Sequence, residues 1–259
     1  MSLYREVEAF RVEDEMRRVP ERIVNDLEVR IRINGGLEQR FTTSPAALRE
    51  FAAGYLLGEG FVDSVDDIVS MDITENLIDV EIESEDLEIR RELVMGSDCF
   101  GGWRQRAEMV EPVDSDLRVR AEDIFHAFRR MVKAATVWRM TGGTHVAALV
   151  TGDEFRVFED VSRHVAVDKA LGSGAMDGVN FSRSFMVYSG RMPADMLIKV
   201  VRAGVPIIAS NAAPTSSGYD AARKTGLTML GFVRGRRFNI YSHPERIILD
   251  SGIATDSEL

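Results

Sequence analysis

The sequence predicts an α/β protein with a smaller, strand-rich N-terminal part. After Pro112, short apolar strands alternate with helices, which is typical of a layered sheet with crossover helices. Before that point, alternating apolar residues predict strands around a single helix. We therefore expect a mixed α+β domain over residues 1–110 and an α/β domain over residues 111–259.

The N-terminal domain is expected to contain strands, a hairpin turn and one helix. Apolar residues alternate with arginines over 29–33, which predicts a strand, and Asn34-Gly35-Gly36 predicts a hairpin turn. Ser44-Pro45 is typical of a helix N-cap and the first helical residue, and Gly58 and Gly60 are typical of the helix end. Further strands are predicted over residues 77–83 and 86–94.

The C-terminal domain begins with a long predicted helix over residues 121–138, in which apolar residues recur at helical intervals. Strands and helices alternate after it. Strands are predicted over 145–150, 155–158, 184–189, 205–210 and 227–233, and helices over 164–171, 193–203 and 216–225.

Composition excludes several classes of protein. Of the 259 residues, 45% are apolar and 29% are charged, as in a globular protein, and no apolar run is long enough to span a bilayer. The net charge of −10 argues against general nucleic-acid binding. The N-terminus lacks the apolar core of a signal peptide, and the chain has one cysteine, so we expect a cytoplasmic protein without membrane or nucleic-acid partners.

That single cysteine, Cys99, lies in an irregular stretch rich in glycine, Gly96 to Trp103. A lone cysteine forms no internal disulfide, so its thiol is inert, a metal ligand or a nucleophile. Free cysteine is most often a small hydrophobe, but this position is typical of an exposed loop. The four histidines show no zinc-binding spacing, so we expect no bound metal.

Four polar loops are predicted at strand ends. In α/β sheets, ligands gather at the carboxyl ends of strands, beside helix N-termini. Turn chemistry or helix capping explains each loop singly, but four together favour a ligand-binding cleft. The candidate binding residues in these loops are Thr141, Gly142, Gly143, His145, Asp160, Arg163, His164, Ser189, Arg191, Pro214 and Thr215.

A fifth candidate is the basic segment 231–238, with Arg234, Arg236 and Arg237 within four residues. Guanidinium groups bind phosphates bidentately, and the flanking phenylalanines offer faces for a heterocycle. A solvated hairpin turn at Gly235 explains the same residues. The specific alternative is a site for a pyrophosphate-bearing nucleotide.

The ordered motifs closely resemble the formate dehydrogenase accessory sulfurtransferase family over about residues 20–247. The motifs that carry this resemblance, in chain order, are Leu48-x-x-Phe51-Ala52-x-Gly54-Tyr55-Leu56-Leu57-x-Glu59-Gly60, Thr141-Gly142-Gly143-x-His145, Glu159-Asp160-Val161-x-Arg163-His164-x-Ala166-Val167-Asp168-Lys169, Ser189-Gly190-Arg191, Ala213-Pro214-Thr215, Gly231-Phe232-x-Arg234 and Arg237-Phe238-Asn239-Ile240-Tyr241.

The resemblance implies a sulfur carrier for molybdenum cofactor maturation. Such a carrier takes sulfane sulfur from a cysteine desulfurase as a persulfide, here on Cys99, and passes it to molybdenum bis(molybdopterin guanine dinucleotide) before insertion into formate dehydrogenase. It also implies a cytidine-deaminase-like α/β domain beside a smaller N-terminal domain, and a homodimer. The residues that match the family's cofactor-binding stretch are Phe232, Val233, Arg234, Gly235, Arg236 and Arg237.

The chain departs from the family pattern in the cysteine loop. Many members carry Cys-x-x-Cys, whereas here Gly102 stands at the second position if Cys99 occupies the first. Ser162 and Val165 also replace the glycine and asparagine that the family favours. Two alternatives therefore stay open: a cofactor-binding chaperone in which Cys99 is incidental, and a hydrolase that pairs Cys99 with His145 or His164.

Overall fold

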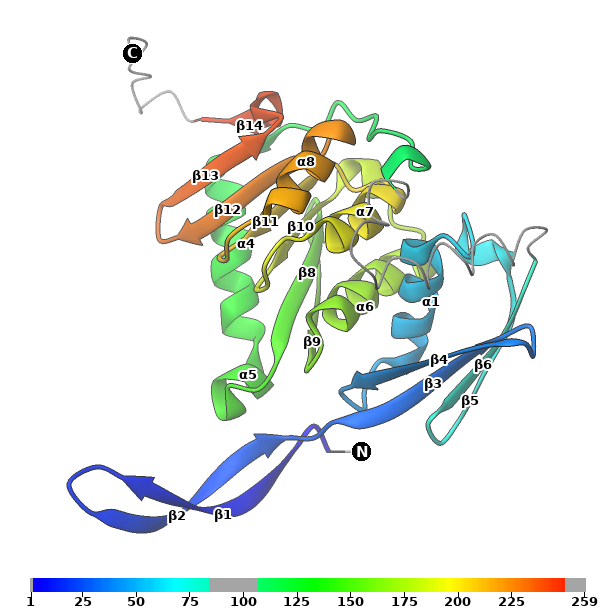
Figure 1. Ribbon diagram of the computed structural model, residues 1–259. Coiled ribbons are helices and arrows are strands. Elements are labelled where there is room, and N and C mark those ends of the chain that lie inside the picture. The colour runs from blue at the N-terminus through cyan, green and yellow to red at the C-terminus, as the bar shows by residue number, and fades with distance from the viewer. Residues whose placement is uncertain (1, 84–106, 250–259) are drawn as a thin grey trace.

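The computed structural model describes residues 2–83 and 107–249 and has a mixed α/β architecture built around a six-stranded sheet (Figure 1). The strand order is β13-β12-β11-β10-β8-β9; β10, β11 and β12 are parallel and the other pairs antiparallel. The α/β class is confirmed, while the cytidine-deaminase-like layering stays a prediction. The strands are β8 (His145–Thr151), β9 (Glu154–Asp160), β10 (Phe185–Tyr188), β11 (Ile207–Ser210), β12 (Thr228–Arg234) and β13 (Arg237–Ser242).

Helices cover both faces of this sheet because its strands are apolar on both sides. In β8, Val146, Ala148 and Val150 belong to a core cluster under α4, while Ala147 and Leu149 belong to a larger cluster under α6 and α7. The helices are α4 (Ala121–Ala134), α5 (Thr136–Thr141), α6 (Arg163–Met176), α7 (Ala194–Arg202) and α8 (Ser216–Lys224). A short parallel pair, β7 (Val119–Arg120) with β14 (Ile247–Ile248), lies outside the sheet.

The N-terminal part contributes a four-stranded sheet of order β4-β3-β6-β5 and the helix α1 (Leu48–Glu59). The predicted hairpin is confirmed, with Asn34 and Gly35 at positive φ in the turn. The strand predicted over 86–94 lies outside the described residues. The strands are β3 (Leu27–Ile33), β4 (Leu37–Thr43), β5 (Ile68–Thr74) and β6 (Leu77–Ile82); short 3₁₀ helices are η1 (Val65–Asp67), η2 (Phe181–Arg183) and η3 (Pro244–Arg246).

Helix α1 packs closely against α6 and joins the N-terminal part to the large sheet. A Cβ at Gly54 would lie 1.8 Å from the Asp168 carbonyl oxygen, and one at Gly172 would lie 1.9 Å from the Glu50 carbonyl oxygen. Only glycine at both positions allows this approach of the two backbones. The larger core cluster therefore draws side chains from both sides of the predicted domain boundary, and the boundary itself stays a prediction.

A buried ion triad lies at the same junction. Lys199 Nζ of α7 is 2.9 Å from both Asp168 Oδ1 of α6 and Glu59 Oε1 at the end of α1. Burial lowers the pKa of Lys199, but the two carboxylates outweigh burial and raise it. The triad therefore fixes three helices at one point with an ammonium that stays charged.

An N-terminal hairpin, β1 (Tyr4–Val12) with β2 (Met16–Val24), escaped the sequence prediction and projects from the body (Figure 1). Both faces of this hairpin are largely exposed, so apolar and polar residues do not alternate regularly along its strands. The two-residue periodicity that predicts a strand is therefore weak. Its base packs beside α5, where a Cβ at Gly143 would lie 2.7 Å from Val24 Cγ1.

Two helix predictions were wrong at their ends. Helix α1 begins at Leu48, not at Pro45, because Ala47 adopts a left-handed conformation and the Ser44 hydroxyl accepts a hydrogen bond from the Val161 backbone N–H instead of capping the helix. The predicted helix 121–138 is two helices, broken at Ala135, whose ψ is 74°.

The second of these helices has its own cap. The Glu159 carboxylate accepts hydrogen bonds from the backbone N–H groups of Val137 and Trp138, at 3.0 and 2.6 Å, at the start of α5. In an unbroken helix, these N–H groups would donate to backbone carbonyl oxygens of α4. Here the Glu159 carboxylate of β9 takes the place of those carbonyl oxygens. Among the residues described, no helix has the length and apolar character needed to cross a membrane.

Candidate functional site

The predicted polar loops meet at one edge of the large sheet. The carboxyl ends of β10, β11 and β12 lie at this edge, and strand direction places the carboxyl end of β9 and the amino ends of β8 and β13 there too. The loop 141–145 was expected at a carboxyl end but precedes β8. Its last residue, His145, still reaches the edge because β8 is antiparallel to β10.

Arg163 and His164 open α6 at this edge, directly after β9. His164 Nε2 lies 2.9 Å from Asp195 Oδ2 in the first turn of α7. Arg163 Nε is buried and has no hydrogen-bond partner, and no ion pair of Arg163 is found among the described residues. An orphaned buried guanidinium nitrogen fits a site that receives an anion, because an unpaired buried donor is otherwise costly.

Positive charge concentrates around this pair. His145, at the start of β8, is half-buried, and burial lowers its pKa, as do the nearby charges of Arg163 and His164. Burial raises the pKa of Asp195, but the hydrogen bond and charge of His164 outweigh it and bring it to about 2. The edge therefore presents the Arg163 guanidinium beside one ionised carboxylate, Asp195.

The loop after β10 lies against Arg163. A Cβ at Gly190 would be 3.4 Å from Arg163 Cβ and 2.7 Å from Tyr188 Cε2, so only glycine fits there. The Tyr188 hydroxyl donates to the Arg191 carbonyl oxygen, while the Arg191 side chain is exposed. Arg191 is thus a further cation at the same edge.

Ser189, Pro214 and Thr215 shape the neighbouring loops. The Ser189 hydroxyl accepts from the Val146 backbone N–H at 2.9 Å. Pro214 forms a β-bridge with Met192, and Thr215 caps α8 by accepting from the Gly218 backbone N–H at 3.1 Å. All three residues are half-buried. These contacts give each of them a structural role, whether or not it also binds a ligand.

The basic segment extends beyond the edge as the turn between β12 and β13. Arg234 pairs with Arg237 in the hairpin register, and Gly235 has φ of 59°, so the turn at Gly235 is confirmed. Leu230 is level with Ala209 of β11, and Arg234 follows four residues later, so Arg234 lies past the end of β11. Three exposed guanidinium groups stand beside the sheet edge, with Arg236 Nη2 at 3.6 Å from Glu122 Oε2 of α4.

Phe232 sits in a bulge of β12 with an unusual backbone. Its φ is 54°, and its N–H donates to the Ala212 carbonyl oxygen at 3.2 Å, which ties β12 to the loop after β11. Positive φ is strained for an aromatic residue and tends to occur at functional sites. The Arg234 guanidinium lies 5.8 Å from the Phe232 ring centroid.

The structure does not bring every candidate into the open edge. Val233 is 2% exposed and belongs to the core cluster under α4. Phe238, one of the phenylalanines expected to offer a face to a heterocycle, packs on Phe125 of α4 with ring centroids 5.1 Å apart. Thr141, Gly142 and Gly143 lie at the end of α5, beside the N-terminal hairpin. Cys99 lies outside the described residues.

Asp160 is fully buried and already satisfied. One carboxylate oxygen accepts from the Thr43 hydroxyl, the Ser44 backbone N–H and Lys169 Nζ, at 2.7, 2.9 and 2.6 Å; the other accepts from the Ser162 backbone N–H at 2.8 Å. The cation paired with Asp160 is Lys169, not the nearby Arg163. Asp160 therefore anchors the start of α6 to the N-terminal part, which leaves Arg163 unpaired.

Sequence reasoning missed Asp195 and Tyr188. Both flank the Ser189-Gly190-Arg191 motif, but neither belongs to it. The only local signal for Asp195 was its place in the first turn of a helix that follows a polar loop. An acidic residue at that place is common, because it interacts favourably with the helix dipole, so the signal does not indicate a binding site.

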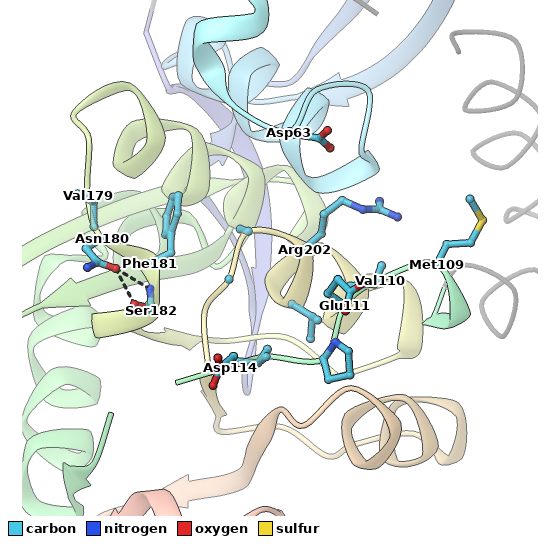
Figure 2. A pocket seen from close by; sticks show the side chains of 15 residues that line it. Asp63, Met109, Val110, Glu111, Asp114, Val179, Asn180, Phe181, Ser182 and Arg202 are labelled. Carbon is cyan, nitrogen blue, oxygen red and sulfur yellow. Dashed lines mark hydrogen bonds between the residues drawn. The ribbon is translucent and has the colours of Figure 1, made fainter. Parts of the chain in front are cut away.

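The described residues also form a cavity of about 590 Å³ away from this edge (Figure 2). It is lined by residues that precede β10 and β11, among them Asn180 and Gly204, and by Asp63, Glu111 and Arg202. It thus lies at the opposite ends of the parallel strands and contains none of the candidate residues. Within residues 2–83 and 107–249, no cluster of three or more histidine, cysteine, aspartate or glutamate side chains could hold a metal ion.

The fold and the edge together define a class: a mixed α/β protein with a cationic binding edge built from the loops of its central sheet. Comparisons with known proteins show the family to which the chain belongs. Residues 24–248 match the FdhD/NarQ family. A sulfur carrier protein FdhD from Methanothermobacter thermautotrophicus is 86% identical over 248 residues, which cover 96% of this chain and all of that relative.

More distant relatives extend the match. A sulfur carrier protein FdhD from Shouchella clausii is 31% identical over 248 residues, covering 90% of this chain and 92% of that protein. A solved structure, a putative formate dehydrogenase accessory protein from Desulfotalea psychrophila, has a TM-score of 0.82 at 24% identity and covers 95% of this chain and 100% of its own. The chain belongs to the FdhD/NarQ family.

Proposed function

We propose that this protein is a sulfur carrier in formate dehydrogenase maturation. The observation that carries the proposal is the convergence of Arg163, His164, Arg191 and the arginine turn at one sheet edge, in a chain of net charge −10. Such an edge suits a ligand with several phosphates. Relatives over most of the chain are called sulfur carrier proteins, which supports the same role here.

The ligand we propose is the molybdenum bis(molybdopterin guanine dinucleotide) cofactor, bound as substrate. The orphaned Arg163 Nε and the exposed Arg191, Arg234 and Arg236 fit its pyrophosphates, and the half-buried Phe232 fits beside a purine. Asp160 and Val233 serve as scaffold in this assignment. We further propose a cytoplasmic homodimer, with a cysteine desulfurase as sulfur donor and formate dehydrogenase as recipient of the cofactor.

The chemical step we propose runs through Cys99. Its thiolate attacks the terminal sulfur of the desulfurase persulfide; the donor S–S bond breaks, a new S–S bond forms on Cys99, and the desulfurase thiolate leaves. No net oxidation occurs in this exchange. In the second transfer the S–S bond on Cys99 would break, the cofactor bound as substrate would accept the sulfane sulfur and supply the two electrons that reduce it, and Cys99 would leave as a thiolate.

A single cysteine suits this cycle. A second thiol in the same loop would attack the persulfide, form a disulfide and release sulfide, which ends the transfer. This chain has no second cysteine, so sulfur on Cys99 can leave only to another molecule.

Mass spectrometry tests the carrier step. After incubation with a cysteine desulfurase and cysteine, the intact protein should gain one sulfur that reductant removes, and Cys99→Ala should gain none. If wild type gains no sulfur but still binds guanine nucleotide, the carrier role is wrong and the alternative of a cofactor-binding chaperone is supported.

Nucleotide binding tests the edge. Arg163→Ala and Arg234→Ala should each weaken guanosine diphosphate binding, since a charge-assisted hydrogen bond contributes roughly 1.5–3 kcal/mol. Arg40→Ala is the matched control, because Arg40 is an exposed arginine of β4 in the N-terminal sheet, paired there with Glu28 and Glu38. Calorimetric affinities that are equal in all three variants and wild type would remove these arginines from the site.

A further inference from the structure

The contact between His164 and Asp195 has a chemical direction. Asp195 is ionised at neutral pH and carries no proton, so its Oδ2 can only accept. His164 Nε2, 2.9 Å away, must therefore be the nitrogen that carries a hydrogen, whatever the charge of the ring. The other nitrogen, Nδ1, has no hydrogen-bond partner among the described residues.

The surrounding charges make this arrangement unusual. Arg163 precedes His164 on α6, His145 faces the pair from β8, Arg191 follows β10, and Asp168 lies one turn along α6. Asp168 is engaged by Lys199, which leaves Asp195 as the carboxylate paired with the cationic cluster at the edge. Tyr188, also close, donates its hydroxyl hydrogen to a carbonyl oxygen and stays neutral, since burial raises its pKa.

We propose that Asp195 is a positioning residue that holds His164 through Nε2–H and presents Nδ1 to the ligand at the sheet edge. Protonated Nδ1 donates to a phosphate oxygen of that ligand. Neutral Nδ1 instead accepts a hydrogen bond from an N–H or O–H group of the ligand. The same logic orients the histidine in aspartate–histidine pairs of enzymes, where a carboxylate fixes the tautomer. Identification of the ligand as a guanine nucleotide rests on the proposed function; the tautomer does not.

Nitrogen-15 NMR of the imidazole rings tests the tautomer directly. The chain has only four histidines, so His164→Gln identifies the His164 signals by their loss. In wild type, the neutral His164 ring should show the Nε2–H pattern. In Asp195→Asn, a population with hydrogen on Nδ1 should appear, and Asp195→Glu should restore the wild-type pattern. A wild-type His164 ring with hydrogen on Nδ1 would overturn the proposal.

Guanosine diphosphate is the probe for the second part of the proposal, that Nδ1 of His164 contacts the ligand. Its addition should shift the His164 Nδ1 resonance in wild type, and Asp195→Asn should weaken its binding about tenfold near neutral pH, the effect of one charge-assisted hydrogen bond.

Asp220→Asn, an exposed carboxylate of α8, is the matched control and should behave as wild type. A purely structural role of Asp195 would lower the affinity in Asp195→Asn without moving hydrogen from Nε2 to Nδ1 of His164, and that outcome would overturn the proposal while leaving the proposed function intact. If wild type binds no guanosine diphosphate, the nucleotide ligand of the proposed function is wrong, and the tautomer measurement alone decides the role of Asp195.

Discussion

Replacing Gly54 with alanine should destabilise the protein because α1 and α6 touch at this residue. On an exposed helix, the same change would stabilise by about 1 kcal/mol, since alanine is the better helix former. Here the new Cβ would lie 1.8 Å from the Asp168 carbonyl oxygen, whereas ordinary contact begins at 3.4 Å. The helices must therefore separate by more than 1 Å, and overpacking of this kind typically costs about 1–3 kcal/mol or more.

We expect a net loss of about 2 kcal/mol or more in the free energy of unfolding, because separation of α1 from α6 also strains the Glu59–Lys199–Asp168 triad. Guanidinium denaturation followed by far-UV circular dichroism measures it. Gly36→Ala is the control: Gly36 has no positive φ, and its nearest neighbour to a new Cβ is 3.8 Å away, so the change should stay within about 0.5 kcal/mol.

The companion variant Gly172→Ala sharpens the test, since its Cβ would lie 1.9 Å from the Glu50 carbonyl oxygen. One separation of the helices relieves both clashes, so the double variant should lose less than the sum of the two single losses. The reasoning is refuted if Gly54→Ala is as stable as wild type, because the helix contact would then not be close.

Three further predictions follow from single contacts. Lys199→Met should cost about 3–5 kcal/mol in chemical denaturation, because it leaves Asp168 and Glu59 buried without their cation; an unchanged midpoint would contradict it. Thr215→Ala should cost about 1 kcal/mol, measured in the same way, through loss of the α8 cap. Because burial and neighbouring cations lower the pKa of His145, stability should be full above the unfolded value of about 6.5 and decline as pH falls below it; His145→Gln should flatten thermal stability measured between pH 7 and 5.

Local sequence signals predicted the strands and helices that bury one face or both faces, because burial imposes a pattern of apolar residues. The strand over 29–33 and its Asn-Gly turn followed from alternation and turn chemistry, and the alternating strands and helices after residue 140 followed from apolar runs between polar loops. The N-terminal hairpin gave a weak signal because it has little buried surface to pattern its side chains.

The errors at helix ends have a different cause. Ser44 looked like an N-cap, but its hydroxyl is taken by a backbone N–H of residue 161, more than a hundred residues away. Ala135 looked helical, but Glu159 from β9 caps a new helix just beyond it. Both depend on a partner distant in sequence, which no local window contains.

The sequence by itself determined which residue types could bind an anion and the order in which they occur, because loops between apolar segments can be read locally. Tertiary structure decided which of them meet. Strand direction gathered the loops at one edge, burial turned Asp160 and Val233 into scaffold, and a side-chain contact between the first turns of α6 and α7 brought Asp195 to His164. Those outcomes arise from contacts between distant segments, and a hydrogen bond 2.9 Å long leaves no trace in the spacing of the residues that make it.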